Sequence, residues 1–131
     1  MNNAATLTQA TRSVVEKLYA GAQQGDVAGL FALISADVVL REPPFLPYGG
    51  EYVGLDGFTK AIGFVMEQMD LTRLEVNHLV VDGERAFAVV RIPVRSGGTA
   101  LLAEEWRVRD GKVTEVRIFF HDAGSIRLSA A

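Results

Sequence analysis

The hydrophobic pattern of the chain changes its period near Asp70, and this change limits the folds that the chain can adopt. Before this point, apart from one short strand, apolar residues recur at helical spacing, and after it they alternate with polar residues as in half-buried strands. Three turn signals interrupt the alternating part, at Asp82-Gly83, Ser96-Gly97-Gly98 and Asp110-Gly111. The predicted strands cover about 72–81, 84–95, 99–109 and 112–121. Because short turns join these strands, we expect an antiparallel meander.

Helices are predicted ahead of this sheet. The apolar spacing predicts a long helix that ends at Gly25, a short one capped by Asp26, and a third with Asp56 in its first turn. The predicted helices cover about 7–24, 27–33 and 55–69. A short strand of about 37–42 lies between the second and third helices, and Pro43 and Pro44 end it. Helices followed by a sheet place the chain in the α+β class.

The composition indicates one domain that covers 1–131. At 131 residues, 49% of them hydrophobic, the chain is long enough for one core. A net charge of -3 without a basic stripe argues against nucleic acid as a partner. No apolar run reaches the ~20 residues of a membrane span, and the first residues, MNNAATLTQATRS, lack the pattern of a signal peptide. We therefore expect a cytoplasmic protein with no membrane partner.

No metal or cofactor is expected from the sequence. The chain has no cysteine, which excludes disulfides and thiolate ligands. His121 and Asp122 are neighbours on a predicted strand, so they point to opposite faces, and no third ligand has a suitable spacing. The sequence also lacks a glycine-rich phosphate loop, a nucleophile elbow and a dinucleotide fingerprint.

One glutamate, Glu104, falls on the apolar side of a predicted hairpin that runs from Leu101 to Phe120. Counting by twos, it shares a face with Leu102 and Trp106, whereas Glu105 lies on the solvated face. A carboxyl group on an apolar face is costly to ionise. Glu104 is therefore expected to be hydrogen-bonded, held neutral or used in chemistry.

A second glutamate, Glu42, shares the parity of Val38 and Leu40, so it should also point inward. If Glu42 and Glu104 line one cavity, their environments could push their pKa values apart and give one base and one neutral hydrogen-bond donor. The residues leave an alternative open, in which each glutamate pairs with a nearby arginine such as Arg41, Arg91 or Arg107.

Four aromatic residues could belong to such a site. Tyr19 lies beside the apolar stripe of the first helix, where its hydroxyl could reach a pocket or its ring could pack in the core. His78 has the parity of Leu74 and could face the interior as an acid or base, or it could be a hydrogen-bonded or interfacial histidine without a chemical role. Tyr48 and Tyr52 flank two glycines after the first strand, which suits either a mobile lid or a surface turn.

The order of these features resembles the nuclear transport factor 2-like superfamily, and in it the SnoaL-like and ketosteroid-isomerase-like branch. The resemblance spans nearly the whole chain and rests on the first helix closing with Gly25-Asp26, the ADVVLREPP segment, the YVGLDGF entry into the third helix, and the EEWRVRDGKV hairpin. It implies a cone-shaped α+β barrel, in which a strongly curved, mainly antiparallel sheet wraps around three N-terminal helices and encloses an apolar pocket. It also implies a homodimer formed through the outer face of the sheet.

The resemblance further implies roles for the candidate residues. In ketosteroid-isomerase-like enzymes an aspartate base ends the first strand before a proline, and Glu42 before Pro43 occupies that place here. A protonated aspartate of the penultimate strand and a tyrosine of the first helix stabilise an enolate there, and Glu104 matches this aspartate. The tyrosine position falls at Leu18, with Tyr19 one residue later and about 100° around the helix.

The leading hypothesis is a cofactor-independent isomerase or cyclase that acts on a small hydrophobic carbonyl compound by acid–base chemistry. Its expected catalytic residues are Glu42, Glu104, Tyr19 and His78. Its expected substrate-binding residues are Leu18, Phe58, Ile62, Val90, Leu102, Trp106, Val116, Ile118 and Phe120. One alternative is a non-catalytic module that binds a small hydrophobic molecule or dimerises, because one fold can host both. A second is an epoxide-hydrolase-type enzyme, for which Arg91 would have to face the site.

Overall fold

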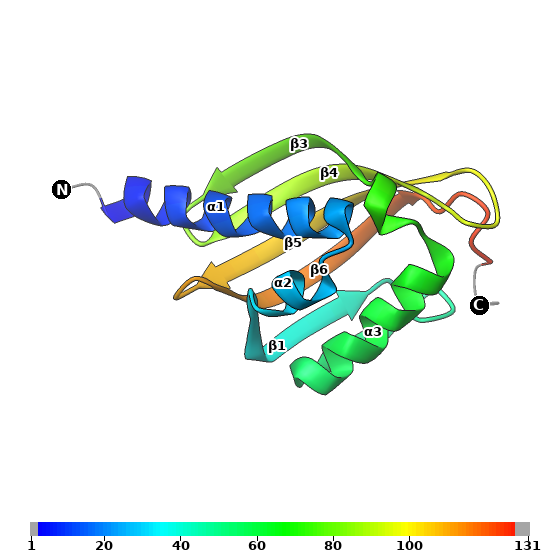
Figure 1. The fold of residues 1–131 in the computed structure, drawn as a ribbon, viewed down its shortest axis with the longest axis horizontal. Coiled ribbons are helices and arrows are strands. Elements are labelled where there is room, and N and C mark those ends of the chain that lie inside the picture. Colours follow the sequence, from blue (N-terminus) through cyan, green and yellow to red (C-terminus); the bar gives the residue numbers. More distant parts are fainter. Residues whose placement is uncertain (1–2, 128–131) are drawn as a thin grey trace.

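The computed structural model describes residues 3–127 as three helices and a six-stranded sheet (Figure 1). The elements are α1 (Asn3–Gln24), α2 (Val27–Phe31), β1 (Ile34–Glu42), β2 (Gly50–Val53), α3 (Gly54–Gln68), a 3₁₀ turn η1 (Leu71–Arg73), β3 (Glu75–Asp82), β4 (Arg85–Pro93), β5 (Thr99–Arg109) and β6 (Lys112–Asp122). The prediction of an α+β fold with three helices and a curved sheet is confirmed. The ends of the predicted domain, 1–2 and 128–131, lie outside the described residues.

The sheet has the strand order β2-β1-β6-β5-β4-β3. The predicted meander is present, since β3, β4, β5 and β6 pair antiparallel in succession. At the other end, β1 pairs parallel with β6 and antiparallel with β2, so the sheet is mixed. The strand β2 was not predicted, because its four residues follow a run of prolines and glycines without a clear alternation.

All three helices cover the same face of the curved sheet (Figure 1). Along β4 the residues Ala86, Ala88, Val90 and Ile92 are buried under the helices, whereas Phe87 between them is exposed on the outer face. On the helix side, α1 packs against β3, β4 and β5, and α3 packs against β1 and β2. Burial of each large aliphatic side chain contributes about 1.5–3 kcal/mol, so this interface carries most of the hydrophobic stabilisation. None of the described helices is long and apolar enough to cross a membrane.

The corner between α1 and α2 has the capping that the sequence predicts. Gly25 adopts a φ of 71°, which ends α1, and the Asp26 side chain accepts a hydrogen bond of 2.9 Å from the backbone N–H of Gly29. This corner turns the chain back across the sheet. The apolar side chains of both helices therefore reach the same space above β5 and β6.

The expectation that His78 faces the interior is wrong. The pairing of β3 with β4 shifts register between Val76 and His78, where one extra residue bulges from β3. The bulge reverses the alternation, so Leu79 and Val81 turn toward the core and His78 is exposed. Counting every second residue from Leu74 therefore predicts the inward-facing side chains of β3 only up to this bulge.

The loop of 43–49 between β1 and β2 is compact and does not match either predicted form. It is closed by hydrogen bonds from Leu46 N–H to the Pro43 carbonyl (3.1 Å) and from Gly49 N–H to the Leu46 carbonyl (3.0 Å). Tyr48 is only 4% exposed, and its ring stacks on Phe64 of α3 with a centroid distance of 6.4 Å. This tyrosine therefore belongs to the core and not to a lid or a surface turn.

Candidate functional site

A cavity lies between the helices and the inner face of the sheet. Its volume is about 80 Å³, enough for several water-sized groups at roughly 10–15 Å³ each. Its lining residues are Leu18, Tyr19, Ala22, Leu30, Leu40, Glu42, Phe58, Ile62, Val65, Met69, Leu71, Leu74, Ile92, Leu102, Glu104, Trp106, Val116, Ile118 and Phe120. Only three of these described residues carry side-chain oxygen, namely Tyr19, Glu42 and Glu104, and none of them is a lysine, arginine or histidine.

The sheet brings the two glutamates to the same level of the cavity wall. Glu104 of β5 pairs with Ile118 of β6, and Glu42 of β1 follows directly after the pair that Arg41 forms with Arg117 of β6. The glutamates therefore flank Ile118 from the two neighbouring strands. Because adjacent strands are about 4.8 Å apart, their backbones are separated by roughly 10 Å, and both side chains point to the inner face.

Glu104 is held by a chain of hydrogen bonds. The Trp106 indole N–H donates to the Tyr19 hydroxyl (2.8 Å), and this hydroxyl donates to Glu104 Oε1 (2.7 Å). The Tyr19 and Trp106 rings also meet edge to face, with centroids 5.9 Å apart. Since an indole N–H can only donate, the Tyr19 oxygen accepts from it and the single Tyr19 proton goes to Glu104. Glu104 therefore has a donor that stabilises its ionised form.

Glu42 is buried without such a donor. It is 6% exposed, and its Oε1 has no hydrogen-bond partner among the described residues. An ionised carboxylate in this position would lose its hydration without compensation. The neutral acid is therefore the favoured form of Glu42.

The pKa values of both glutamates are raised. Burial, followed by the negative charge of Glu104, raises the pKa of Glu42 to about 8. Burial also raises the pKa of Glu104 to about 7, although the hydrogen bond from Tyr19 lowers it. Glu104 is half-buried as a residue, and it lines the cavity. Glu42 therefore keeps its proton to a higher pH than Glu104 does.

The structure brings most of the predicted site residues together. Those that line the cavity are Leu18, Tyr19, Glu42, Phe58, Ile62, Leu102, Glu104, Trp106, Val116, Ile118 and Phe120. His78 is exposed and does not line it, and Val90 is fully buried but lies outside the lining. The alternation of the sequence correctly predicts that Val90 points inward. It does not predict which inward residue of β4 lies beside the cavity, and that residue is Ile92.

The sequence reasoning missed eight lining residues. They are Ala22, Leu30, Leu40, Val65, Met69, Leu71, Leu74 and Ile92. Several, such as Leu30 and Val65, lie on the predicted apolar stripes of the helices, which was the available signal. A stripe shows that a residue faces the interior, but not whether packed side chains or a cavity lie opposite.

The alternative in which arginines pair with the two glutamates does not hold for the described residues. Arg41 bonds to Glu51 and Glu115, both at 3.2 Å. Arg107 contacts Glu84 and Glu115 on the outer face of the sheet. Arg91 is exposed on β4, so it cannot supply the arginine of an epoxide-hydrolase-type site.

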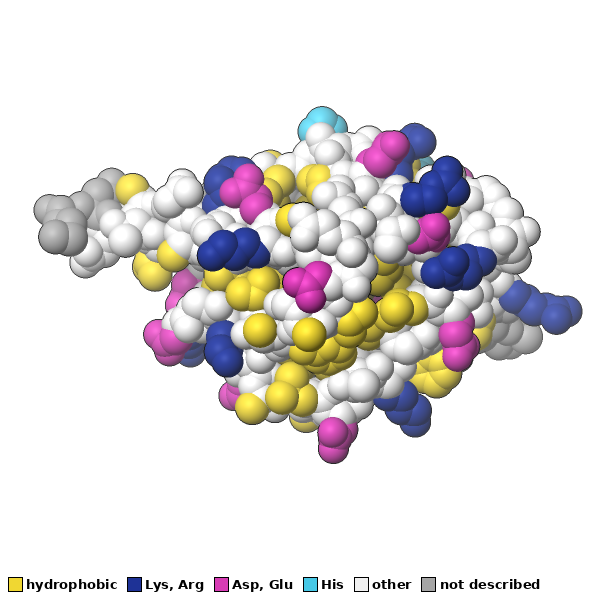
Figure 2. Space-filling view, in the orientation of Figure 1, with side chains coloured by type: hydrophobic (Ala, Val, Ile, Leu, Met, Phe, Trp, Pro, Cys, Tyr) yellow, Lys and Arg dark blue, Asp and Glu magenta, His cyan; other side chains and the backbone are white. Residues whose placement is uncertain are grey.

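Two surface hollows adjoin the cavity. One lies between the α1–α2 corner and α3 and shares Ala22, Leu30, Ile62 and Leu71 with the cavity lining. Hydrophobic side chains gather between α2 and α3 on this face (Figure 2), and the hollow includes Val27 and Met66, which are 41% and 39% exposed. The other hollow lies where β1 ends and shares Glu42, Ile118 and Phe120 with the cavity. Glu42 therefore lies at the boundary between the cavity and the second hollow.

The protein is therefore an α+β protein in which three helices cover one face of a curved mixed sheet, with a cavity between the helices and the sheet. The chain belongs to the SnoaL-like domain family, whose family model matches residues 15–116, within the nuclear transport factor 2-like superfamily. No curated protein matches the chain.

Solved structures with the same fold are numerous. A nuclear transport factor 2-like protein from Burkholderia xenovorans has a TM-score of 0.70 and 23% identity over 88% of this chain and 92% of its own. A protein from Kribbella flavida, provisionally named a ketosteroid isomerase, has a TM-score of 0.72 and 21% identity over 88% of this chain and 80% of its own. TerC co-crystallised with polyporic acid has a TM-score of 0.72 and 23% identity over 85% of this chain and 91% of its own. These likenesses establish the fold.

Proposed function

We propose that the protein is a cofactor-independent enzyme that isomerises or cyclises a small hydrophobic carbonyl compound by acid–base chemistry. The observation that carries this proposal is the pair of glutamates on the wall of one apolar cavity, with a hydrogen-bond donor on only one of them. Carboxyl groups placed in different environments at one site are suited to act as acid and base together.

The hydrogen bonds favour a particular division of labour. Glu104, ionised and oriented by Tyr19, removes a proton from the carbon next to the substrate carbonyl. Glu42, neutral and buried, gives its proton to the carbonyl oxygen, so an enol forms and no free enolate accumulates. Return of a proton to the same or another carbon, or attack of the enol carbon on a second carbonyl, completes exchange, isomerisation or ring closure. This division is the reverse of the one that the family resemblance implies.

The lining also limits the substrate class. Among the described residues, the cavity wall supplies no cation that could offset a carboxylate or phosphate on the ligand, and Glu104 would repel both. The remaining wall is aliphatic and aromatic. An uncharged molecule with an apolar frame and at least one carbonyl group fits this chemistry.

Hydrogen exchange on a simple ketone tests the proposal. In D₂O the protein should speed the exchange of the α-hydrogens of cyclohexanone, followed by proton NMR. The variants Glu104→Gln and Glu42→Gln should each slow it by about a hundredfold or more, because each removes one partner of the proton transfer. Glu105→Gln is the matched control, since Glu105 pairs with Arg85 on the outer face. Exchange in Glu104→Gln as fast as in the unchanged protein would overturn the proposal.

A binding module without catalysis is the second candidate. The specific observation in its favour is that TerC, which has the same fold, was crystallised with a small molecule, polyporic acid. The same exchange experiment separates the two functions. A protein that binds cyclohexanone but does not exchange its hydrogens would be a binding module.

The proposal extends to a cytoplasmic homodimer that pairs through the outer face of the sheet. Phe87 and Phe119 are 47% and 46% exposed on this face, and Val80 is 65% exposed. Large aromatic side chains at such exposure are typical of surfaces that pair with another protein surface. Dimerisation would cover the side of the sheet opposite the cavity and leave the cavity itself unobstructed.

A further inference from the structure

Two buried polar atoms have no hydrogen-bond partner among residues 3–127, and both lie near the end of β1. They are Glu42 Oε1 and the hydroxyl oxygen of Tyr48. Their side chains are only 6% and 4% exposed. Buried polar groups without a partner are rare and costly, so each of these two calls for a physical explanation.

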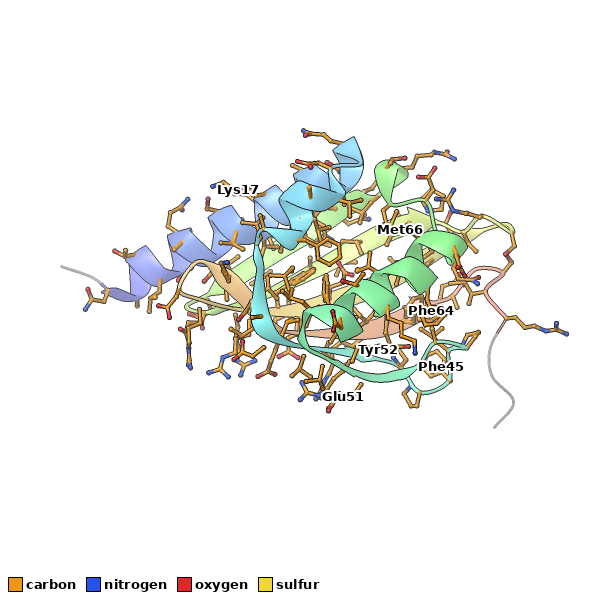
Figure 3. The ribbon with its side chains drawn as sticks, turned by 60° about the horizontal axis from the view of Figure 1, so that its bottom comes forward. Lys17, Phe45, Glu51, Tyr52, Phe64 and Met66 are labelled. Atoms are coloured by element: carbon orange, nitrogen blue, oxygen red, sulfur yellow. The ribbon has the colours of Figure 1, made fainter. Side chains whose placement is uncertain are left out.

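The backbone of the loop keeps these two residues close. Glu42 pairs with Gly50 in the β1–β2 ladder, so the chain returns to Glu42 only two residues after Tyr48. Gly49 makes this return possible, because a Cβ at this position would collide with the Pro43 carbonyl oxygen and lie 2.8 Å from Pro44 Cα. The ring of Tyr48 is held by its stacking on Phe64 of α3. Figure 3 labels Phe64 together with Phe45, which belongs to the loop that contains Tyr48.

The Tyr48 hydroxyl is within the electrostatic influence of Glu42 and remains protonated. Burial raises the pKa of Tyr48 above its ordinary value, and the charges of Glu42 and Tyr52 raise it further. The other groups that face Glu42 are Glu104 on β5, which is acidic, and Tyr52 on β2, whose hydroxyl donates to the Tyr48 carbonyl (2.7 Å). Tyr48 is thus the hydroxyl near Glu42 whose proton is not already committed.

We propose that Tyr48 is a positioning residue that donates its hydroxyl proton to Glu42 Oε1 when Glu42 becomes ionised. This arrangement mirrors the pair that Tyr19 and Glu104 already form. The Tyr48 hydroxyl is not part of the cavity lining, so Tyr48 acts on the substrate only through Glu42. The inference rests on the proposed function, because Glu42 becomes ionised when it gives its proton to the substrate oxygen.

The expected consequence is a site with two hydrogen bonds from tyrosine to glutamate. The bond from Tyr19 to Glu104 is always present, and the bond from Tyr48 to Glu42 forms only when Glu42 is ionised. In the resting protein Glu42 is neutral, and the bond to Tyr48 is not formed. After the proton leaves Glu42, the bond offsets part of the cost of a buried charge, since hydrogen bonds to charged groups are about twice as strong as neutral ones. Without Tyr48, Glu42 would hold its proton more tightly and transfer it more slowly.

The test is a titration of the glutamate side chains by carbon-13 NMR in the full chain. Tyr48→Phe keeps the ring and its stacking, and it should raise the pKa of Glu42 by about one unit, a tenfold change in its ionisation equilibrium. Tyr52→Phe, which removes a hydroxyl that is bonded to backbone, is the matched control and should leave Glu42 unchanged. An unchanged titration of Glu42 in Tyr48→Phe would overturn the proposal.

A second measurement needs no variant. In the unchanged protein the chemical shift of the Tyr48 Cζ should move with the same midpoint as the Glu42 carboxyl carbon, because the hydroxyl changes its bonding when Glu42 ionises. A Tyr48 signal that does not follow Glu42 would contradict the proposal.

The kinetic readout separates this inference from the proposed function. Tyr48→Phe should lower kcat for cyclohexanone exchange about tenfold with little change in KM. If the unchanged protein exchanges no hydrogen but Tyr48→Phe still raises the pKa of Glu42, the proposed function fails and the role of Tyr48 stands. If exchange occurs and Tyr48→Phe changes neither kcat nor the pKa, the role of Tyr48 fails alone.

Discussion

At the scale of single residues, the chemistry of the cavity depends on how hydrogen-bond donors are distributed between two carboxyl groups. Tyr19 has one proton, and the contact from Trp106 leaves that proton directed at Glu104. Glu42 has burial but no donor in the resting state. A difference of one hydrogen bond is enough to decide which acid holds a shared proton, because a bond to a charged group contributes about 1.5–3 kcal/mol.

Removal of the Tyr19 hydroxyl tests this distribution. Tyr19→Phe should raise the pKa of Glu104 above about 7, because it removes the hydrogen bond that favours the ionised carboxylate. Trp106→Phe should act in the same direction but more weakly, since it only frees the Tyr19 hydroxyl to rotate. Carbon-13 NMR of the glutamate carboxyls measures both shifts. A lower pKa of Glu104 in Tyr19→Phe would contradict the arrangement.

The pH dependence of stability tests the burial of Glu42. Its pKa is about 8 in the folded protein and has the ordinary value of 4.5 after unfolding, so the folded state holds the proton more tightly. Stability should therefore be highest below pH 4.5 as far as this group is concerned, and fall as the pH rises toward 8, by up to about 1.4 kcal/mol per pH unit.

Glu42→Gln should flatten this curve and be more stable than the unchanged protein at pH 8, because an amide does not ionise. Urea unfolding at several pH values measures the difference. Glu105→Gln, on the outer face, should keep the steep curve. Parallel curves for the unchanged protein and Glu42→Gln would show that Glu42 ionises in the folded state at its ordinary pKa.

At the scale of elements, the 43–49 loop positions both the end of β1 and Tyr48. Gly49→Ala should destabilise the fold by about 1–3 kcal/mol, because its Cβ would meet backbone atoms of Pro43 and Pro44 that cannot move aside easily. Gly63→Ala is the matched control. Its Cβ would meet nothing within 4 Å on α3, so it should stabilise the fold by about 0.5–1 kcal/mol. Urea unfolding of the two variants checks the opposite signs.

The elements also show how far the sequence could be used to predict this structure. The limits of β5 at Thr99 and Arg109 follow from turn residues and alternation, and Glu104 turns inward as that alternation requires. His78 does not turn inward as predicted, because a bulge in β3 inserts one residue into the strand. No residue type in the sequence marks this bulge. The parallel pairing of β1 with β6 joins segments far apart in the chain, so no local pattern encodes it.

Similar reasoning explains which site residues could be predicted. Glu42 and Glu104 were identified as polar residues on apolar faces, and Tyr19 by its position beside an apolar stripe. Tyr48 is recognisable in the sequence only as a lid or turn residue, because its burial depends on the close approach of Gly49 to Pro43, which is a tertiary contact. The donor on Glu104 and its absence on Glu42 likewise depend on the packing of α1 over β5.

At the scale of the whole molecule, the two faces of the sheet have different chemistry. The inner face carries the cavity. The outer face carries exposed Phe87 and Phe119, a network of ion pairs among Arg41, Glu51, Glu84, Arg107, Arg109 and Glu115, and a separate pair of Arg85 with Glu105. Surface ion pairs contribute little stability each, but they can fix the register of a pairing surface. The proposed dimer would use this outer face and leave the cavity on the other side of the sheet uncovered.

A charge on the outer face tests the proposed dimer. Phe119→Asp should shift the protein from dimer to monomer in sedimentation velocity, because the added carboxylate would lose its hydration in the interface. Glu75→Gln, at the exposed start of β3, is a suitable control for a surface change away from these phenylalanines. An unchanged protein that sediments as a monomer at all concentrations would contradict the dimer.

The most direct test of the central claim is the carbon-13 NMR titration of Glu42 and Glu104 in the unchanged protein. We expect Glu104 to titrate near pH 7 and Glu42 near pH 8, with the Glu42 midpoint falling in Glu104→Gln because the neighbouring charge is gone. Midpoints for both residues near the ordinary value of 4.5 would show that the two acids do not share a proton in an apolar cavity.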